Sequence, residues 1–248
     1  MVMGVDSQRN LQLVVQRIKE IESDGVLISG DLTHQGTLNS YQTLKEILCP
    51  IKQPIFVIGG NHDQADNLEK SFKERLFKSF KLANWEIINI DSVQAKKTHG
   101  LVTQSALLEL DQACLNSDAA HIMIVLHHPI VPMNSNWDDA LSLTNPQDLF
   151  QVLDKHSKIR LITFGHAHEA AEFSHLGIKI LSCPSTALQF NQEMRVGFNE
   201  LELNENGTIN FKTQWIWTLN IYIIYTIRVK RRLIVTFRNC LNQIIKKY

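Results

Sequence analysis

Four short stretches of the chain place metal-binding and acid–base side chains directly after an apolar segment. They are Gly30-Asp31, Gly60-Asn61-His62-Asp63, His127-His128-Pro129 and Gly165-His166-Ala167-His168. Carboxylate oxygen, amide oxygen and imidazole nitrogen all bind divalent metals, and this mixture suits iron, manganese or zinc better than an all-oxygen magnesium site. One Asp or His after a strand means little, whereas the ordered set of four indicates a metal centre.

The segments around these motifs alternate between helical and strand patterns as far as residue 164, and short strands without helices follow. Open α/β sheets place their sites at the carboxyl ends of strands, so the four loops should converge. The pattern predicts two sheets packed face to face with helices outside. We expect helices at 7–22, 39–48, 68–77, 103–115 and 147–156, and strands at 26–29, 54–58, 86–90, 121–126, 159–164, 172–175, 178–182, 197–203 and 208–214.

Composition favours one main globular domain, since the 248 residues are 44% hydrophobic and 20% charged. The net charge is zero, but residues 218–248 hold seven Lys or Arg and no acidic residue. We therefore expect a domain over 1–217 and a basic tail over 218–248. The apolar run 215–227 is too short for a membrane span, and the N-terminus lacks a secretory signal pattern. A cytoplasmic protein without a transmembrane segment is expected.

The four motifs, in this order, resemble the signature of the calcineurin-like metallophosphoesterases. Within that superfamily the chain looks most like the bacterial cyclic nucleotide phosphodiesterases, through Gly4-Val5-Asp6, Cys183-Pro184-Ser185-Thr186, Gln189-Phe190 and the stretch 195–214. The resemblance covers about residues 4–217. It implies a four-layer α-β-β-α sandwich of two mixed sheets, and two divalent metals, with Fe²⁺ or Mn²⁺ favoured over Zn²⁺ or Mg²⁺.

The implied reaction is hydrolysis of a small phosphodiester, with 3′,5′-cyclic AMP converted to AMP. Two cations about 3.5–4 Å apart can clamp the ester and lower the pKa of a bridging water, generating hydroxide for in-line attack. Other phosphodiesters or phosphomonoesters remain an alternative, because the same metal core serves several substrates. Nucleic acid is expected as a partner only through the basic tail, and a homo-oligomer stays open.

The resemblance also implies a role for each motif residue. Asp31 would bridge both metals, His168 would bind the first, and Asn61, His127 and His166 would bind the second. His127 is preferred to His128 because the family places its ligand two residues before the proline. His62 would protonate or stabilise the leaving oxygen, and Asp63 would orient the His62 ring. The residues expected to contact substrate are Asp31, Asn61, His62 and His168. His34 could either line the pocket or simply form part of its loop, and the sequence favours neither.

The chain departs from the family pattern at its beginning. Family members start with a strand that ends in Asp-x-His, and both residues bind the first metal. The single Asp-x-His here, Asp154-Lys155-His156, ends an expected helix and should point away from the site. We therefore expect a fold without its first strand, exposed strand edges, a weakened first metal position and, as a further alternative, a catalytically impaired remnant.

Overall fold

The computed structural model describes residues 4–218 of the chain. The chain divides into one compact unit, Met1–Ile216, and a second, Trp217–Tyr248, of which only the first two residues are described. The basic tail predicted for 218–248 thus lies, apart from Thr218, outside the described residues. Within residues 4–218 no helix has both the length and the apolar character needed to cross a bilayer.

Several helices begin at a residue whose side-chain oxygen caps the first turn. Asp6, Thr37 and Thr103 each accept a hydrogen bond from a backbone N–H of the first turn, which satisfies a donor that the helix itself leaves unpaired. The helices are α1 (Ser7–Ile18), α2 (Leu38–Leu48), α3 (Ala65–Phe72) with a 3-10 turn (Lys73–Arg75), α4 (Gln104–Asn116), α5 (Asn136–Leu141) and α6 (Pro146–Leu153).

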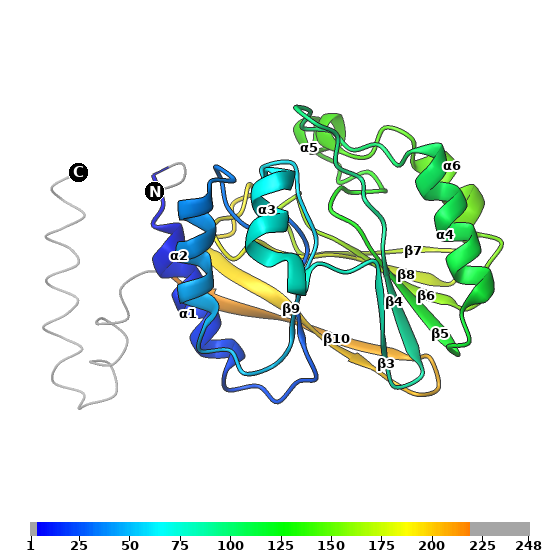
Figure 1. Ribbon diagram of the computed structural model, residues 1–248, viewed down its shortest axis with the longest axis horizontal. Coiled ribbons are helices and arrows are strands. Elements are labelled where there is room, and N and C mark those ends of the chain that lie inside the picture. Colours follow the sequence, from blue (N-terminus) through cyan, green and yellow to red (C-terminus); the bar gives the residue numbers. More distant parts are fainter. Residues whose placement is uncertain (1–3, 219–248) are drawn as a thin grey trace, which may run out of the picture. The chain divides into compact units, whose positions relative to one another are not determined.

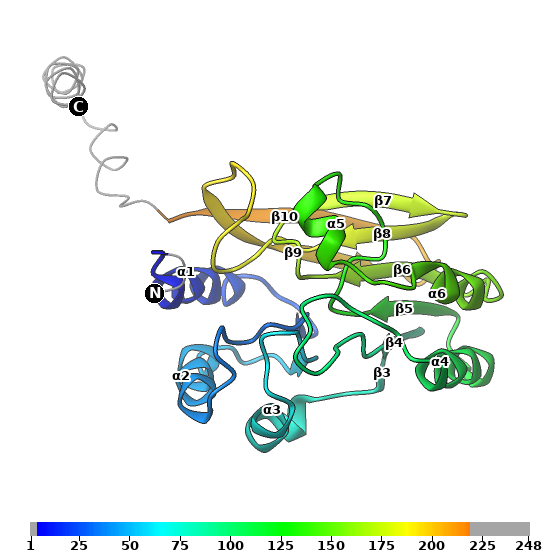
Figure 2. The same cartoon turned by 90° about the horizontal axis from the view of Figure 1, so that it is seen from above.

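The largest sheet is mixed and has six strands in the order β3-β4-β5-β6-β8-β7 (Figure 2). Its four central strands are parallel, so their carboxyl ends meet at one edge, and antiparallel strands close both sides. The strands of the sheet are β3 (Ser79–Leu82), β4 (Trp85–Asn89), β5 (His121–Val125), β6 (Ile159–Phe164), β7 (Ala171–His175) and β8 (Ile178–Ser182).

The second layer of strands is made of two separate pairs. β1 (Val26–Ile28) lies parallel to β2 (Ile55–Val57), and β9 (Arg195–Leu203) pairs with β10 (Ile209–Trp217). Among the described residues no strand joins the two pairs. The expected α/β sandwich with a gap at its first strand is therefore confirmed.

Three hydrophobic clusters hold four layers together (Figure 1). One face of the six-stranded sheet packs on α4 and α6, for example through Ile124 and Leu149. Its other face packs against both strand pairs, with Met123 and Leu161 buried between the sheets. Helices α1 to α3 cover the outer side of β1 and β2, where Tyr41 is fully buried.

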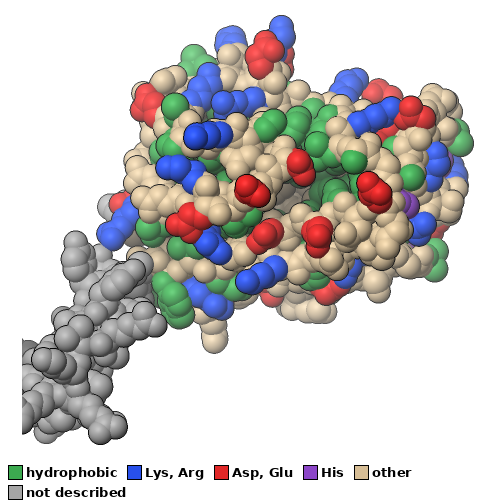
Figure 3. Space-filling model, turned by 90° about the horizontal axis from the view of Figure 1, so that it is seen from below, with side chains coloured by type: hydrophobic (Ala, Val, Ile, Leu, Met, Phe, Trp, Pro, Cys, Tyr) green, Lys and Arg blue, Asp and Glu red, His purple; other side chains and the backbone are tan. Residues whose placement is uncertain are grey.

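A cavity of about 1860 Å³ separates β1 from β9 and continues to the carboxyl edge of the strands. Consecutive residues of both strands line it, 26–28 and 198–203, so the cavity borders their unpaired edges rather than one face. Figure 3 shows a hollow on one side of the molecule, with hydrophobic side chains inside and acidic side chains around it. Glu22, Asp24, Glu200 and Glu202 supply acidic groups to the cavity lining.

The expected elements are all present, with shifted ends and two additions. Helix α1 ends at Ile18, four residues before the expected end, and α3 starts three residues early. Strand β3 and helix α5 were not expected. β3 is a four-residue edge strand of alternating exposure, and α5 has six residues, so neither carries a long periodic pattern.

Helix α4 offers a matched pair of substitutions that tests the packing of the outer layer. Leu110 is 3% exposed and Leu108 is 58% exposed on the same helix. Leu110→Ala should lower the free energy of unfolding by about 2–5 kcal/mol, because it leaves a cavity against the six-stranded sheet. Leu108→Ala should change it by no more than about 0.5 kcal/mol. Urea unfolding followed by circular dichroism measures both, and equal losses would contradict this packing.

Candidate functional site

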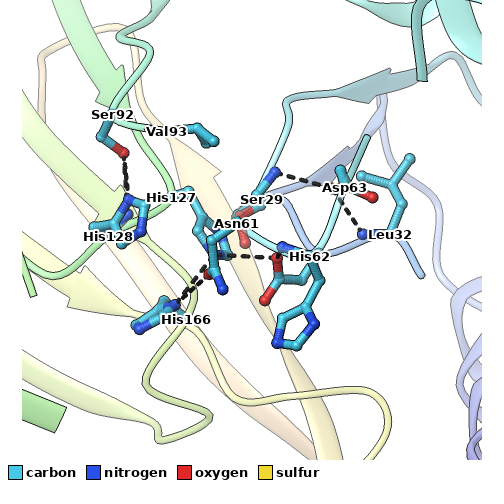
Figure 4. Close-up of polar contacts among 12 residues, drawn as sticks. Ser29, Leu32, Asn61, His62, Asp63, Ser92, Val93, His127, His128 and His166 are labelled. Carbon is cyan, nitrogen blue, oxygen red and sulfur yellow. Dashed lines mark hydrogen bonds and ion pairs between the residues drawn. The ribbon is translucent and has the colours of Figure 1, made fainter. Parts of the chain in front are cut away.

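Side chains from both strand layers meet at the carboxyl edge of β1, β2, β5 and β6. Oδ1 of Asn61 lies 2.9 Å from Nδ1 of His166 and 3.1 Å from Nε2 of His127. Those two nitrogens are 3.3 Å apart, and Nε2 of His127 is 3.4 Å from Oδ1 of Asp31. Figure 4 shows the Asn61 side chain between the two imidazoles. The structure thus brings four of the predicted metal ligands together.

The spacing of these four atoms fits ligands of one cation. Ligand atoms about 2.1 Å from a metal stand roughly 3.0–3.4 Å apart in octahedral or tetrahedral arrangements. The four distances above fall in or just below that range. His168 lines the same cavity, and its buried Nδ1 has no hydrogen-bond partner among the described residues. The donor set and this unpaired nitrogen both fit bound divalent metal.

The backbone around the centre adopts conformations that side chains rarely take. Asp31, His166 and His168 have φ values of 50°, 63° and 50°, a left-handed region that is unfavourable for residues other than glycine. Close approach of other residues to the backbone explains why positions 30 and 60 are glycine. A Cβ on Gly60 would overlap the Asp31 backbone and carboxylate, and one on Gly30 would overlap the His127 ring.

The two adjacent histidines after β5 have different surroundings. Nδ1 of His127 donates to the backbone carbonyl of Ser29 at 2.8 Å, which leaves Nε2 facing Asn61 and Asp31. Nδ1 of His128 instead lies 2.8 Å from Oγ of Ser92, on the other side of the loop (Figure 4). Donor atoms of His127, His128 and His166 all come within 4.8 Å of one another. Only His127 of the adjacent pair also contacts Asn61 and Asp31, which supports its choice as the ligand.

Burial and neighbouring charges set the protonation states of the centre. Burial opposes ionisation of both Asp31 and His127, yet their mutual attraction outweighs it, lowering the pKa of Asp31 and raising the pKa of His127. Burial, assisted by the nearby His127, lowers the pKa of His166 to about 3. Burial likewise lowers the pKa of His168 to about 4. Both imidazoles are neutral at pH 7, which is the protonation state that binds metals.

His62 is exposed at the mouth of the centre rather than buried in it. Its backbone N–H donates to Oδ1 of Asp31 at 2.9 Å, while its ring stacks on His34 with centroids 4.9 Å apart. Nδ1 of His62 donates to the backbone carbonyl of His34 at 3.2 Å. Both rings line the cavity, so His34 belongs to the pocket, one of the two places that the sequence left open.

Asp63 has partners other than the expected His62 ring. Its Oδ2 accepts from the backbone N–H groups of Gly60 and Leu32, at 2.9 and 3.1 Å. Its Oδ1 accepts from the hydroxyl of Tyr41 at 2.8 Å. Burial raises the pKa of Asp63 although these hydrogen bonds oppose the rise. In this structure Asp63 fixes the two loops that carry Asp31 and Asn61, and the carbonyl of His34 orients the His62 ring.

Sequence reasoning missed four residues that hold the site. Tyr41 and Ser92 lie on other elements, and no local pattern connects them to Asp63 and His128. The carbonyl of Ser29 acts through the backbone, which no side-chain pattern reveals. Phe190 was noticed as part of Gln189-Phe190, but its stacking on His168, with ring centroids 4.1 Å apart, required the folded chain.

The Asp154-Lys155-His156 sequence serves other purposes, as expected. Nε2 of His156 lies 2.7 Å from a carboxylate oxygen of Asp111, and Asp154 contacts the ring of His175. Neither lines the cavity. These residues therefore do not replace a metal-binding motif at the centre.

Comparisons with known proteins agree with this geometry. The family model described as calcineurin-like phosphoesterase matches residues 4–170. A probable cyclic nucleotide phosphodiesterase of Ruthia magnifica is 56% identical over 214 residues, which cover 86% of this chain and 92% of the relative. The 3′,5′-cyclic adenosine monophosphate phosphodiesterase CpdA of Pseudomonas aeruginosa is 26% identical over 220 residues, covering 84% and 81%.

A solved structure gives the same result for the fold. A dimetal phosphatase from Danio rerio aligns with a TM-score of 0.61 at 13% identity, over 85% of this chain and 83% of its own. At that identity the likeness concerns the arrangement of strands and helices alone.

Two adjacent glycines provide a test of the centre. Gly60→Ala should reduce bound Mn²⁺ at least tenfold, because its Cβ would displace the Asp31 carboxylate. Gly59→Ala should keep wild-type metal content, because its Cβ would meet only the flexible end of Leu68, at 3.3 Å. Mass spectrometry of the metal after dialysis measures both, and circular dichroism confirms that both variants fold. Equal metal content would remove Asp31 from the ligand set.

Proposed function

Since the chain belongs to the calcineurin-like phosphoesterase family, whose members are metal-dependent hydrolases, we propose that it hydrolyses 3′,5′-cyclic AMP to AMP. The convergence of Asp31, Asn61, His127 and His166 carries the proposal, because it supplies the donors that phosphoester hydrolysis on divalent metals requires. The relatives named as cyclic nucleotide phosphodiesterases support this substrate class.

We assign Asn61, His127 and His166 to one cation, His168 to a second, and Asp31 to a bridging position. Fe²⁺ or Mn²⁺ suits the mixture of imidazole and oxygen donors better than Mg²⁺. Bound there, the cations would polarise the phosphate and activate water. Asp31, Asn61, His62 and His168 would then surround the phosphate.

His62 is the proposed general acid. Its ring is exposed to the cavity, and its backbone bond to Asp31 ties its position to the metal centre. Because its Nδ1–H bonds to the carbonyl of His34, its Nε2 is the nitrogen left to meet the leaving oxygen, and Nε2 must carry the second ring proton to act as the acid. Asp63 is a positioning residue in this scheme, since it holds the loop without contacting substrate.

One observation favours a second candidate, a protein that binds a single cation and turns over slowly. The compact group of four donors lies on one side of the centre, whereas His168 faces the cavity between β1 and β9. Of the ligands assigned above, this second position has His168 and the bridging Asp31. Metal counting separates the candidates, since two metals per chain favour the hydrolase and one favours the single-cation protein.

An assay of the purified chain with Mn²⁺ or Fe²⁺ tests the proposal, with cyclic AMP and bis(p-nitrophenyl) phosphate as substrates. Metal-dependent formation of AMP is expected and should cease with a chelator. Turnover of the nitrophenyl diester alone would support a phosphodiesterase with another substrate. Absence of turnover with both substrates would refute the hydrolytic proposal for this chain.

The role of His62 gives a sharper prediction. His62→Ala should lower kcat for cyclic AMP by about 10²- to 10⁴-fold, the usual effect of removing a general acid. The loss should be smaller for bis(p-nitrophenyl) phosphate, whose leaving group departs without a proton. His175→Ala, outside the cavity, should retain activity with both. A loss of the same size on both substrates would exclude the general-acid role, and an unchanged rate would remove His62 from the mechanism.

A further inference from the structure

Two aromatic side chains extend the metal centre along one wall of the cavity. The Phe190 ring stacks on His168 with centroids 4.1 Å apart and planes 6° from parallel. Trp137 meets Phe190 edge to face with centroids 4.8 Å apart. We name Trp137 and Phe190 the aromatic platform. We propose that this platform, together with Asp138, binds the base of an amino-substituted purine 3′,5′-cyclic nucleotide, an assignment that rests on the proposed function.

The platform is apolar surface left open beside a polar site. Trp137 is 54% exposed and Phe190 is 38% exposed, and both line the cavity. Single exposed apolar residues are common on protein surfaces and need no explanation. Here two rings from distant parts of the chain, α5 and the loop after β8, touch each other at the mouth of one cavity. An exposed aromatic pair in such a place fits a flat ligand, because every nucleobase has a face that stacks.

Ring contacts connect the platform to the metal centre. The Phe190 ring lies between Trp137 and the His168 imidazole and contacts both. A cyclic nucleotide likewise has one sugar between its phosphate and its base. A phosphate held beside His168 therefore leaves the base within reach of the platform, whereas a phosphodiester without a base would not use it.

Asp138 supplies an independent observation. This residue is only 6% exposed and lines the same cavity. Its Oδ1 is buried and has no hydrogen-bond partner among the described residues. A buried acceptor without a donor is unfavourable, and the amino group of an amino-substituted purine is a donor that could satisfy it. Asp138 follows Trp137 directly in α5, so the acceptor and the stacking surface come from one turn of helix.

Contact between α5 and the loop after β8 could instead serve packing alone, and substrate comparison separates the two roles. The substrates are cyclic AMP and methyl riboside 3′,5′-cyclic phosphate, which carries no base. Trp137→Ala should raise KM for cyclic AMP about 5- to 100-fold, the usual range for loss of base stacking. It should leave KM for the compound without a base, and kcat for both, unchanged.

Three further variants sharpen the result. Trp137→Phe should recover part of the KM for cyclic AMP, because it restores a ring. Leu176→Ala, which removes an apolar side chain that is 79% exposed and outside the cavity lining, should behave as wild type. Asp138→Leu, which keeps much of the shape of the side chain and removes both acceptor oxygens, should reduce the preference for cyclic AMP over purine riboside 3′,5′-cyclic phosphate, which lacks the amino group. An unchanged preference would overturn the assignment of Asp138.

If Trp137→Ala changes KM equally for cyclic AMP and for the compound without a base, the platform is overturned. The platform is also overturned if neither KM changes. Either result leaves the hydrolytic proposal intact. Binding without turnover gives the complementary readout. AMP should quench the fluorescence of wild-type protein and lose this effect in Trp137→Ala. Base-dependent quenching in a chain that hydrolyses nothing would support the platform and refute the hydrolase. Failure of both quenching and turnover would refute both.

Discussion

The centre depends on the crowding of four electron-pair donors in a buried space. Oxygen atoms of Asp31 and Asn61 and nitrogen atoms of His127 and His166 lie within 3.4 Å of a neighbour in the group. Hydrogen bonds alone satisfy such a group poorly, because oxygens of Asp and Asn accept and a neutral imidazole has a single N–H. The raised pKa of His127 has the same cause, an excess of acceptors over donors, since Asp31 stabilises a proton on His127 against the effect of burial. A divalent cation resolves it more completely than a proton, which can serve only one or two of the acceptors.

This crowding also ties the two strand layers to each other. Asp31 and Asn61 follow β1 and β2, whereas His127 and His166 follow β5 and β6 of the six-stranded sheet. The bond from His127 to the carbonyl of Ser29 is a direct polar link between the layers. Because β1 and β2 border the cavity and lack the support of β9, a cation held by both layers would stabilise the weaker one. Binding of a cation at this position would therefore favour folding of the β1–β2 layer.

Sequence patterns located the four loops because each follows an apolar strand that stops at a polar or glycine residue. Such strands are local features, and parallel pairing brings their ends together without further information. Contacts formed between distant segments could not be found in this way. Tyr41 reaches Asp63 from helix α2, and Phe190 reaches His168 from the loop after β8, so both roles exist only in the folded chain. Strand β3 was missed because its alternation between exposed and half-buried residues extends over only four positions.

The hydrogen-bond partners of Asp63 show that it does not orient the His62 ring. A carboxylate bonded to the His62 ring would fix its tautomer strongly. The Asp63 carboxylate instead accepts hydrogen bonds from Gly60, Leu32 and Tyr41. Among the described residues the His62 ring contacts the carbonyl of His34 at 3.2 Å and stacks on the His34 imidazole with centroids 4.9 Å apart, while its backbone N–H donates to Asp31. Its main chain is thus held by Asp31, and its ring is oriented by the carbonyl and the imidazole of His34. Together these contacts fix the position from which the proposed acid would reach the leaving oxygen.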